Sequence, residues 1–396
     1  MFETLEGRTL LAATPSGMVP DQIRHAYGFD QVGFLHRHRT IPGDGRGQTI
    51  AIVTAYDAPT IKNDLLVFDR QFGLPTTDAY GRSTLSVVIH RSNPPADAGW
   101  GLEAALDVEW AHAIAPKAHI LLVQAASAST ANLLTAVNYA RSQPGVVAVS
   151  MSWGGHETPF DTYNDDYLTT PAGHVGGYGM AGGVTFVSAS GDNGQPASWP
   201  ATSTHVVAVG GTTLTLGKGG KWRGESAWSG SGGGISQYQG TYAPDVAYDA
   251  DPASGFSVYD SYQGQGWRTV GGTSAGCPQW AALIVIADEG RELSGMPSLD
   301  GPSQTLSALY AISHKAFHDI TTGANSNYAA QVGYDLVTGR GSPVVARTIP
   351  ALAAYADAGA AQAASPAVVA SPAIAMTGVR RVRQSFDGLF GMMDIL

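Results

Sequence analysis

The chain has 396 residues and a formal net charge of −10, and charged residues make up only 14% of it. This length is enough for one large or two ordinary domains with a sizeable core. The negative charge argues against a broad nucleic-acid-binding surface. Because the low charge content and the scarcity of lysine suit an acidic or extracellular setting, we expect an extracellular or cell-surface protein.

Cys277 is the only cysteine, so no intramolecular disulfide can form. No apolar run reaches the length of about 18 residues that marks a transmembrane helix, so none is predicted. The opening MFETLEGRTLLAA lacks the basic and apolar regions of an ordinary signal peptide, but it resembles a short pattern at the start of many large exported bacterial proteins. We expect a short leader (1–18), a main domain (19–350), an Ala/Ser/Pro linker (351–378) and a tail (379–396).

Apolar, β-rich runs alternate with helical patterns over most of the main domain. The predicted strands cover residues 49–56, 84–90, 118–125, 146–153 and 184–190. The predicted helices cover residues 58–73, 102–115 and 129–142. Continuous apolar strands separated by amphipathic helices predict an α/β fold in which helices flank a buried, mainly parallel sheet. Functional residues of such sheets lie at the carboxyl ends of the strands.

The remaining segments have less regular patterns. Residues 217–272 are rich in turn residues and are expected to form surface loops with short strands. The Ala/Ser/Pro tract that begins near residue 351 is not expected to pack. The tail, VRRVRQSFDGLFGMMDIL, is basic and then apolar, and we interpret it either as a docking or anchoring segment or as a disordered end.

Ser274 is the first candidate for chemistry, because it follows two glycines and precedes a long apolar run in VGGTSAGCPQWAALIVIADEG. If a helix opens near Ala275, Pro278 lies in its first turn, where its missing N–H has no intrahelical partner. The serine then lies beside free N–H groups and the positive end of the helix dipole, which favour a developing oxyanion. The pattern predicts a nucleophile, and a helix cap is the alternative.

No histidine stands out as an activating base among the 11 in the chain, but two carboxylates do. Glu103 and Asp107 are four residues apart, so they project from one helical face. Two close carboxylates titrate in coupled steps, and the pair can act as a base with an acidic working range. Trp110 follows Asp107 by three residues and could shield the pair from water. A solvated helix face is the alternative interpretation.

A third acid, Asp192, follows the predicted strand 184–190 in a Gly-Asp-Asn-Gly turn. A protonated aspartic acid at this edge of the sheet can donate a hydrogen bond to an oxyanion. Ordinary turn chemistry is the alternative, because Asp and Asn favour such positions.

Together these motifs resemble, in their order and setting, the sedolisin (serine-carboxyl) peptidases. The resemblance covers most of the chain and includes GQTIAIVTAYDAP, SMSWGG, GGGISQY and PDVAYDADPASGFSVYD. It implies a subtilisin-like fold and the hydrolysis of a protein or peptide substrate. It also implies that Ser274 attacks the peptide carbonyl. Glu103 would be the general base, oriented by Asp107, and Asp192 would complete the oxyanion hole.

The same resemblance implies a calcium site. The ligands would be the carboxylates of Asp319 and Asp335 and the backbone carbonyls of Ile320, Gln331 and Gly333. Two aspartates that bracket a glycine-containing loop suit a hard cation with oxygen ligands, and plain turn residues are the alternative. The family often has glycine where Gln331 stands, which a carbonyl ligand tolerates.

The SMSWGG stretch ends a predicted strand and resembles the segment that pairs with extended substrate in subtilisin-like folds. We therefore expect Ser152, Trp153 and Gly154 to bind substrate, with a core position for Trp153 as the alternative. Family members usually carry a large N-terminal prodomain. Because the resemblance begins near Val19, an inactive protein and a differently controlled one both stay open as alternatives.

The sequence thus predicts a monomeric, acid-acting endopeptidase that binds one Ca²⁺. Glu103 must be ionised to accept the Ser274 proton while Asp192 stays protonated, and these two demands define an acidic pH window. A tripeptidyl-peptidase and an inactive, surface-associated binding module on the same scaffold are the alternatives.

Overall fold

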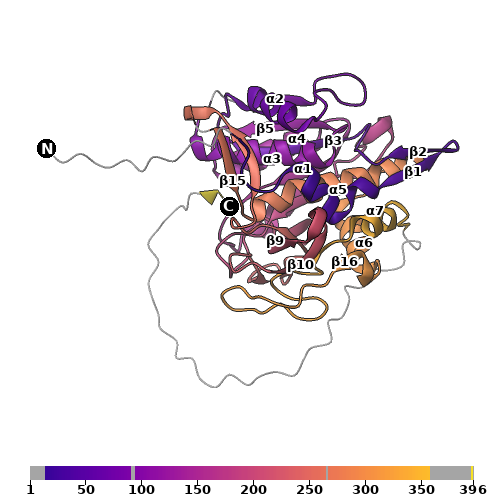
Figure 1. The fold of residues 1–396 in the computed structure, drawn as a ribbon. Coiled ribbons are helices and arrows are strands. Elements are labelled where there is room, and N and C mark those ends of the chain that lie inside the picture. Colours follow the sequence, from indigo (N-terminus) through magenta and orange to yellow (C-terminus); the bar gives the residue numbers. More distant parts are fainter. Residues whose placement is uncertain (1–13, 91–93, 265, 357–393, 396) are drawn as a thin grey trace, which may run out of the picture.

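A computed structural model describes residues 14–90, 94–264, 266–356 and 394–395 (Figure 1). An eight-stranded sheet forms its centre, in the order β10-β9-β8-β6-β3-β5-β4, with β13 also paired to β9. The strands are β3 (Thr49–Ala55), β4 (Leu85–Ile89), β5 (His119–Ala125), β6 (Val146–Met151), β8 (Thr185–Ala189), β9 (Val206–Leu216), β10 (Trp222–Ala227) and β13 (Val246–Asp249). All neighbours pair parallel except β10, which is antiparallel to β9. The predicted α/β fold with a mainly parallel sheet is confirmed.

The central strands are apolar on both faces because helices cover both faces of the sheet. Every residue of β6, which reads VVAVSM, is buried, and so is every residue of β8. Helices α3 (Ala98–Ile114) and α5 (Thr273–Leu293) pack against each other and on one face. Helix α4 (Thr130–Arg141) covers the other face, against β3, β5 and β6.

The remaining elements surround this core. The other α-helices are α1 (Pro20–Tyr27), α2 (Ile61–Phe72), which packs on α3, α6 (Leu306–Ala311) and α7 (Val345–Ala353). The short helical turns cover Phe29–Gln31, Asp161–Tyr163, Asp165–Leu168, Gly177–Gly179, Lys218–Gly220, Tyr262–Gly264, Gly301–Thr305 and His314–Ala316. Within the described parts of the chain, none of the helices combines the length and apolar character that a bilayer crossing requires.

In the described parts of the chain, five two-stranded pairs lie outside the central sheet. They are β1 (Gly33–His36) with β2 (Arg39–Pro42), β11 (Gly234–Ile235) with β12 (Tyr242–Ala243), β14 (Phe256–Asp260) with β15 (Gly266–Val270), β16 (Phe317–His318) with β17 (Ser342–Pro343), and β7 (Trp153–Gly154) with β18 (Asp394–Ile395). Two of these pairs, β11 with β12 and β14 with β15, come from the turn-rich segment 217–272, as its composition predicts. The leader up to residue 13 and most of the linker and tail lie outside the described residues.

Helix α5 begins earlier than the sequence indicates. It starts at Thr273 rather than near Ala275, so Pro278 lies inside the helix and beyond its first turn. The prediction that an N–H at position 278 would have no intrahelical partner is therefore wrong. An N–H at position 278 would meet the carbonyl of Ser274, four residues earlier.

Candidate functional site

The predicted nucleophile, Ser274, is the second residue of α5 and is fully buried. The N-cap position belongs to Gly272, so Ser274 is not the cap of this helix. Gly272 has φ 118°, a conformation that L side chains rarely adopt, and a Cβ there would lie 2.5 Å from the Asp192 carboxyl oxygen Oδ2. Only glycine therefore fits between the two predicted reactive groups.

The Ser274 hydroxyl is hydrogen-bonded to Glu103. Glu103 lies on α3 and is only 6% exposed, and Asp107, one turn further on, is fully buried. The interpretation of this pair as a solvated helix face is therefore wrong. Helix α3 is buried on nearly all sides because it lies among the sheet, α5, α2 and β14.

Burial is the main reason why both acids of the pair bind protons tightly. It raises the pKa of Glu103 well above its usual range, and the nearby Asp107 charge raises it further. Burial raises the pKa of Asp107 to about 8. Among the described residues, Glu103 Oε1 and Asp107 Oδ2 are buried without a hydrogen-bond partner. The pair therefore retains at least one proton through the acidic range.

Ser152 connects the end of β6 to the carboxyl pair and to α5. Its hydroxyl donates to Asp107 Oδ1 at 2.7 Å, and its oxygen lies 3.4 Å from the carbonyl oxygen of Ser274. Because Pro278 has no N–H for that carbonyl, Ser152 can approach it. The sequence predicts Ser152 as a substrate contact, and the structure places its hydroxyl on Asp107.

Asp192 reaches α5 from the loop that follows β8. Its Oδ1 accepts two hydrogen bonds from Thr273, one from the backbone N–H at 2.8 Å and one from the hydroxyl at 2.9 Å. The Thr273 hydroxyl in turn accepts the N–H of Gly191 at 3.1 Å. Burial raises the pKa of Asp192. Because Oδ1 is already an acceptor, Oδ2 beside Gly272 is the place for the proton of the neutral acid.

The two tryptophans that the sequence singles out belong to the core. Trp153 is fully buried, and its Nε1–H donates to the Val53 carbonyl at 2.9 Å. Trp110 is also buried, donates to the Ser257 carbonyl at 3.0 Å and packs edge-on against Phe256. Trp153 thus takes the core position that was its alternative, and only the backbone of β7 (Trp153–Gly154) forms a strand edge.

The histidines are not part of this arrangement. His112 is buried, and its Nε2 lies 2.9 Å from the Pro75 carbonyl oxygen and 3.2 Å from Asp69 Oδ1. His156 is exposed on the surface. Thr273 is the contributor that sequence reasoning missed. Its place directly before the predicted nucleophile was the available signal, because a hydroxyl at a helix start can join two loop groups.

The five predicted calcium ligands lie together in one loop region. The N–H of Gly333 lies 3.1 Å from each carboxyl oxygen of Asp319, and the N–H of Gln331 lies 3.2 Å from Asp335 Oδ2. Asp335 Oδ1 accepts from two further backbone N–H groups. In the described parts of the chain, no group of three or more His, Cys, Asp or Glu side chains could hold a metal. Two carboxylates with backbone carbonyls are nevertheless an oxygen donor set of the kind that Ca²⁺ takes.

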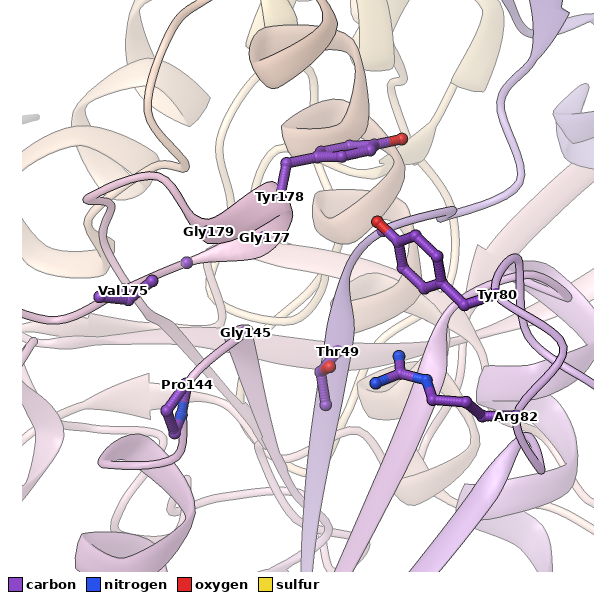
Figure 2. Close-up of a pocket in the computed structure, with 11 residues that line it drawn as sticks. Thr49, Tyr80, Arg82, Pro144, Gly145, Val175, Gly177, Tyr178 and Gly179 are labelled. Carbon is purple, nitrogen blue, oxygen red and sulfur yellow. The ribbon is translucent and has the colours of Figure 1, made fainter.

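A cavity of about 320 Å³ lies at the opposite edge of the sheet, where β3 and β6 begin. Figure 2 shows Tyr178 on one side of it and Tyr80 and Arg82 on the other. None of the predicted site residues lines this cavity. It is therefore separate from the site at the carboxyl ends of the strands.

A mainly parallel sheet flanked by helices, with a serine at the start of a long central helix, is the arrangement of the subtilisin-like class of α/β proteins. A model of the subtilase family matches residues 98–297, which is half of the chain. The chain belongs to the sedolisin (serine-carboxyl peptidase) family on this fold.

Two curated relatives and a solved structure illustrate the likeness. Kumamolisin from Bacillus sp. (strain MN-32) is 29% identical, with 86% of this chain and 64% of that protein covered. Sedolisin from Pseudomonas sp. (strain 101) is 25% identical, with 87% and 63% covered. The chain thus spans somewhat less than two thirds of these relatives. The structure of Pseudomonas sedolisin with two molecules of pseudo-iodotyrostatin has a TM-score of 0.70 at 22% identity and covers 85% of this chain and 98% of that one.

Proposed function

We propose that the protein is an acid-acting serine-carboxyl endopeptidase, and the hydrogen bond between the Ser274 hydroxyl and Glu103 inside a buried acid pair carries this proposal. In the first step the Ser274 oxygen attacks the peptide carbonyl carbon, and its proton passes to the ionised Glu103. The tetrahedral intermediate then collapses, the C–N bond breaks, and Glu103 returns the proton to the leaving amine. Water repeats the sequence on the acyl-enzyme and releases the acid product.

Two further acids act through charge and position. Protonated Asp192 would donate from Oδ2 to the oxyanion, because its Oδ1 is held by Thr273. Asp107, whose carboxyl accepts the Ser152 hydroxyl, would hold the single proton of the pair and orient the ionised Glu103. An assay with a fluorogenic peptide between pH 3 and 5 tests the proposal. No hydrolysis by the folded protein would contradict it.

The rate of hydrolysis is expected to fall as the pH rises through the raised pKa of Asp192, because the ionised carboxylate cannot donate to the oxyanion. Asp192→Asn supplies a neutral donor that does not titrate, so this fall should disappear from the pH profile of kcat/KM. Any fall toward low pH should persist in this variant, because it would come from protonation of the Glu103–Asp107 pair and not of Asp192.

Asp245→Asn is the matched control for this pH profile. Asp245 is another buried acid, with its pKa raised to about 6, but it bonds to Tyr310 and Ala208 rather than to α5. Its variant should keep the wild-type profile. A wild-type profile that peaks in the alkaline range, with activity lost at pH 4, would refute the assignment.

We further propose that Asp319, Asp335 and the carbonyls of Ile320, Gln331 and Gly333 hold one Ca²⁺ when it is bound. The ion would stabilise the folded protein through the mass action of a ligand that binds only the native state. Removing calcium with a chelator should lower the melting temperature, and added Ca²⁺ should restore it. Asp335→Asn should be less sensitive to both treatments. An unchanged melting temperature after complete metal removal would exclude the site.

We place the protein outside the cell or on its surface and propose that it acts as a monomer. Endopeptidase action is distinguished from tripeptidyl-peptidase action by mass spectrometry of the products from a long peptide. Internal cleavage with blocked amino termini supports the endopeptidase assignment, and release of tripeptides from free amino termini only would replace it.

A further inference from the structure

A segment from the far end of the chain pairs with the strand next to the candidate site. Strand β18 (Asp394–Ile395) is antiparallel to β7 (Trp153–Gly154), with Asp394 opposite Gly154 and Ile395 opposite Trp153. Figure 1 shows β18 as a yellow arrow on the opposite side of the molecule from α7, the last helix before it among the described residues. This contact therefore does not follow from closeness in sequence.

The direction of β18 leads toward the reactive groups. As the chain advances from Asp394 to Ile395, the partner positions run back from Gly154 to Trp153, toward Ser152. The Ser152 hydroxyl contacts Asp107 and lies close to the Ser274 carbonyl. Strand β18 also lies beside α3, the helix that carries the acid pair. The segment thus occupies an edge that leads directly to the predicted nucleophile.

Strand β7 offers its backbone rather than its side chains at this edge. The Trp153 ring is bonded to Val53 in the core, and Gly154 has no side chain. Among the described residues, β18 is the strand partner of β7, while Gly155 forms a bridge with Trp199. An unpaired strand edge accepts extended peptides through main-chain hydrogen bonds, largely without regard to sequence. A bound β18 and a substrate strand would therefore compete for the same groups.

We propose that Asp394–Ile395 is an autoinhibitory strand that competes with peptide substrate for β7. This inference rests on the proposed peptidase function, because it assigns the regulation of the same site. Since the strand belongs to the same chain, its competition with substrate is intramolecular and does not weaken when the protein is diluted. A weak two-residue pairing can therefore compete with dilute substrate. The inhibition is competitive in form.

The test removes the main-chain donors of β18 in the full chain. Opposed residues in an antiparallel pair alternate between hydrogen-bonded and non-hydrogen-bonded positions, so both are replaced, as Asp394→Pro with Ile395→Pro. The control places the same two prolines in the linker, as Ala363→Pro with Ala364→Pro. The β18 variant should have a KM lower by about tenfold with kcat nearly unchanged, as loss of a tethered competitor requires. The control should match the wild type.

A second measurement tests the pairing of β18 with β7 without relying on peptide hydrolysis. In the Ser274→Ala background, hydrogen exchange at Trp153 and Gly154 should be faster in the β18 variant than in the linker control. Equal exchange in the two, or an unchanged KM, overturns the autoinhibitory strand. Faster exchange with no hydrolysis by any variant instead supports the pairing and overturns the peptidase assignment, so the two failures are distinguishable.

Discussion

Ser274→Ala is expected to abolish peptide hydrolysis, because it removes the oxygen that would form the acyl-enzyme. Glu103→Gln should lower kcat/KM by at least about 10²-fold, since an amide cannot accept the serine proton. Both variants should fold, because neither change adds volume or charge to this buried site. Hydrolysis of a fluorogenic peptide at pH 4 is the measurement, with the melting temperature recorded alongside.

Glu109→Gln supplies a matched control on the same helix. Glu109 is fully buried, its pKa is raised by burial, and its Oε2 accepts the N–H of Tyr259 rather than the Ser274 hydroxyl. The same chemical change at this position should leave kcat/KM within a few-fold of the wild type. If Ser274→Ala retains wild-type activity, the mechanism fails. If Glu109→Gln loses as much as Glu103→Gln, the loss reflects helix stability and not general-base catalysis.

The second large effect concerns stability, which is expected to be greater at pH 4 than at pH 8. Several buried carboxyls outside the acid pair have raised pKa values: Asp245 to about 6, Asp249 and Glu292 to about 7, and Glu289 to about 8. A raised pKa means that the folded protein binds the proton more tightly than the unfolded chain does. The stability from each group is therefore complete below its unfolded pKa and is lost as the pH rises through the folded value.

The expected size of this effect is several kcal/mol. For Asp249, a shift from 3.8 to about 7 corresponds to roughly 4 kcal/mol, because one pKa unit equals about 1.4 kcal/mol. Urea unfolding at pH 4, 6 and 8 measures the change. Asp249→Asn should reduce the difference between pH 4 and pH 8, since the amide does not titrate. A protein that is more stable at pH 8 than at pH 4 would contradict the protonation of these groups.

If urea unfolding gives this stability profile, the result would agree with the proposed acid action on grounds separate from the site. A folded state that holds protons on buried acids is best suited to a medium that supplies them. The sequence does not indicate these raised pKa values, because acids such as Asp249 and Glu289 titrate normally until the fold buries them.

The sheet and the main helices could be predicted because their signals are local. A short β-branched run such as VVAVSM predicts a strand buried on both faces, and the structure has β6 there. The hydrogen bond between Ser274 and Glu103 could not be predicted from their spacing in the sequence, since it depends on how α3 packs against α5. Only the family resemblance linked the two residues. The side-chain position of Trp153 also depended on packing, because a strand at the sheet end can direct a ring either to the core or to solvent.

The start of α5 shows a different limit. Local rules place a proline in the first turn of a helix, but Pro278 lies deeper. Tertiary contacts supply what the local rule omits: Asp192, from another loop, receives the N–H of Thr273 and so allows the helix to begin two residues earlier.

The tight approach at Gly272 links two distant positions in their evolutionary history. Any descendant that keeps an acid at 192 has to keep glycine at 272, since even one methyl group would displace that acid. Conversely, in a lineage that loses the acid at 192, only the positive φ still favours glycine at 272. Substitutions at positions 192 and 272 should therefore be correlated across related sequences, although the two positions lie eighty residues apart in the chain.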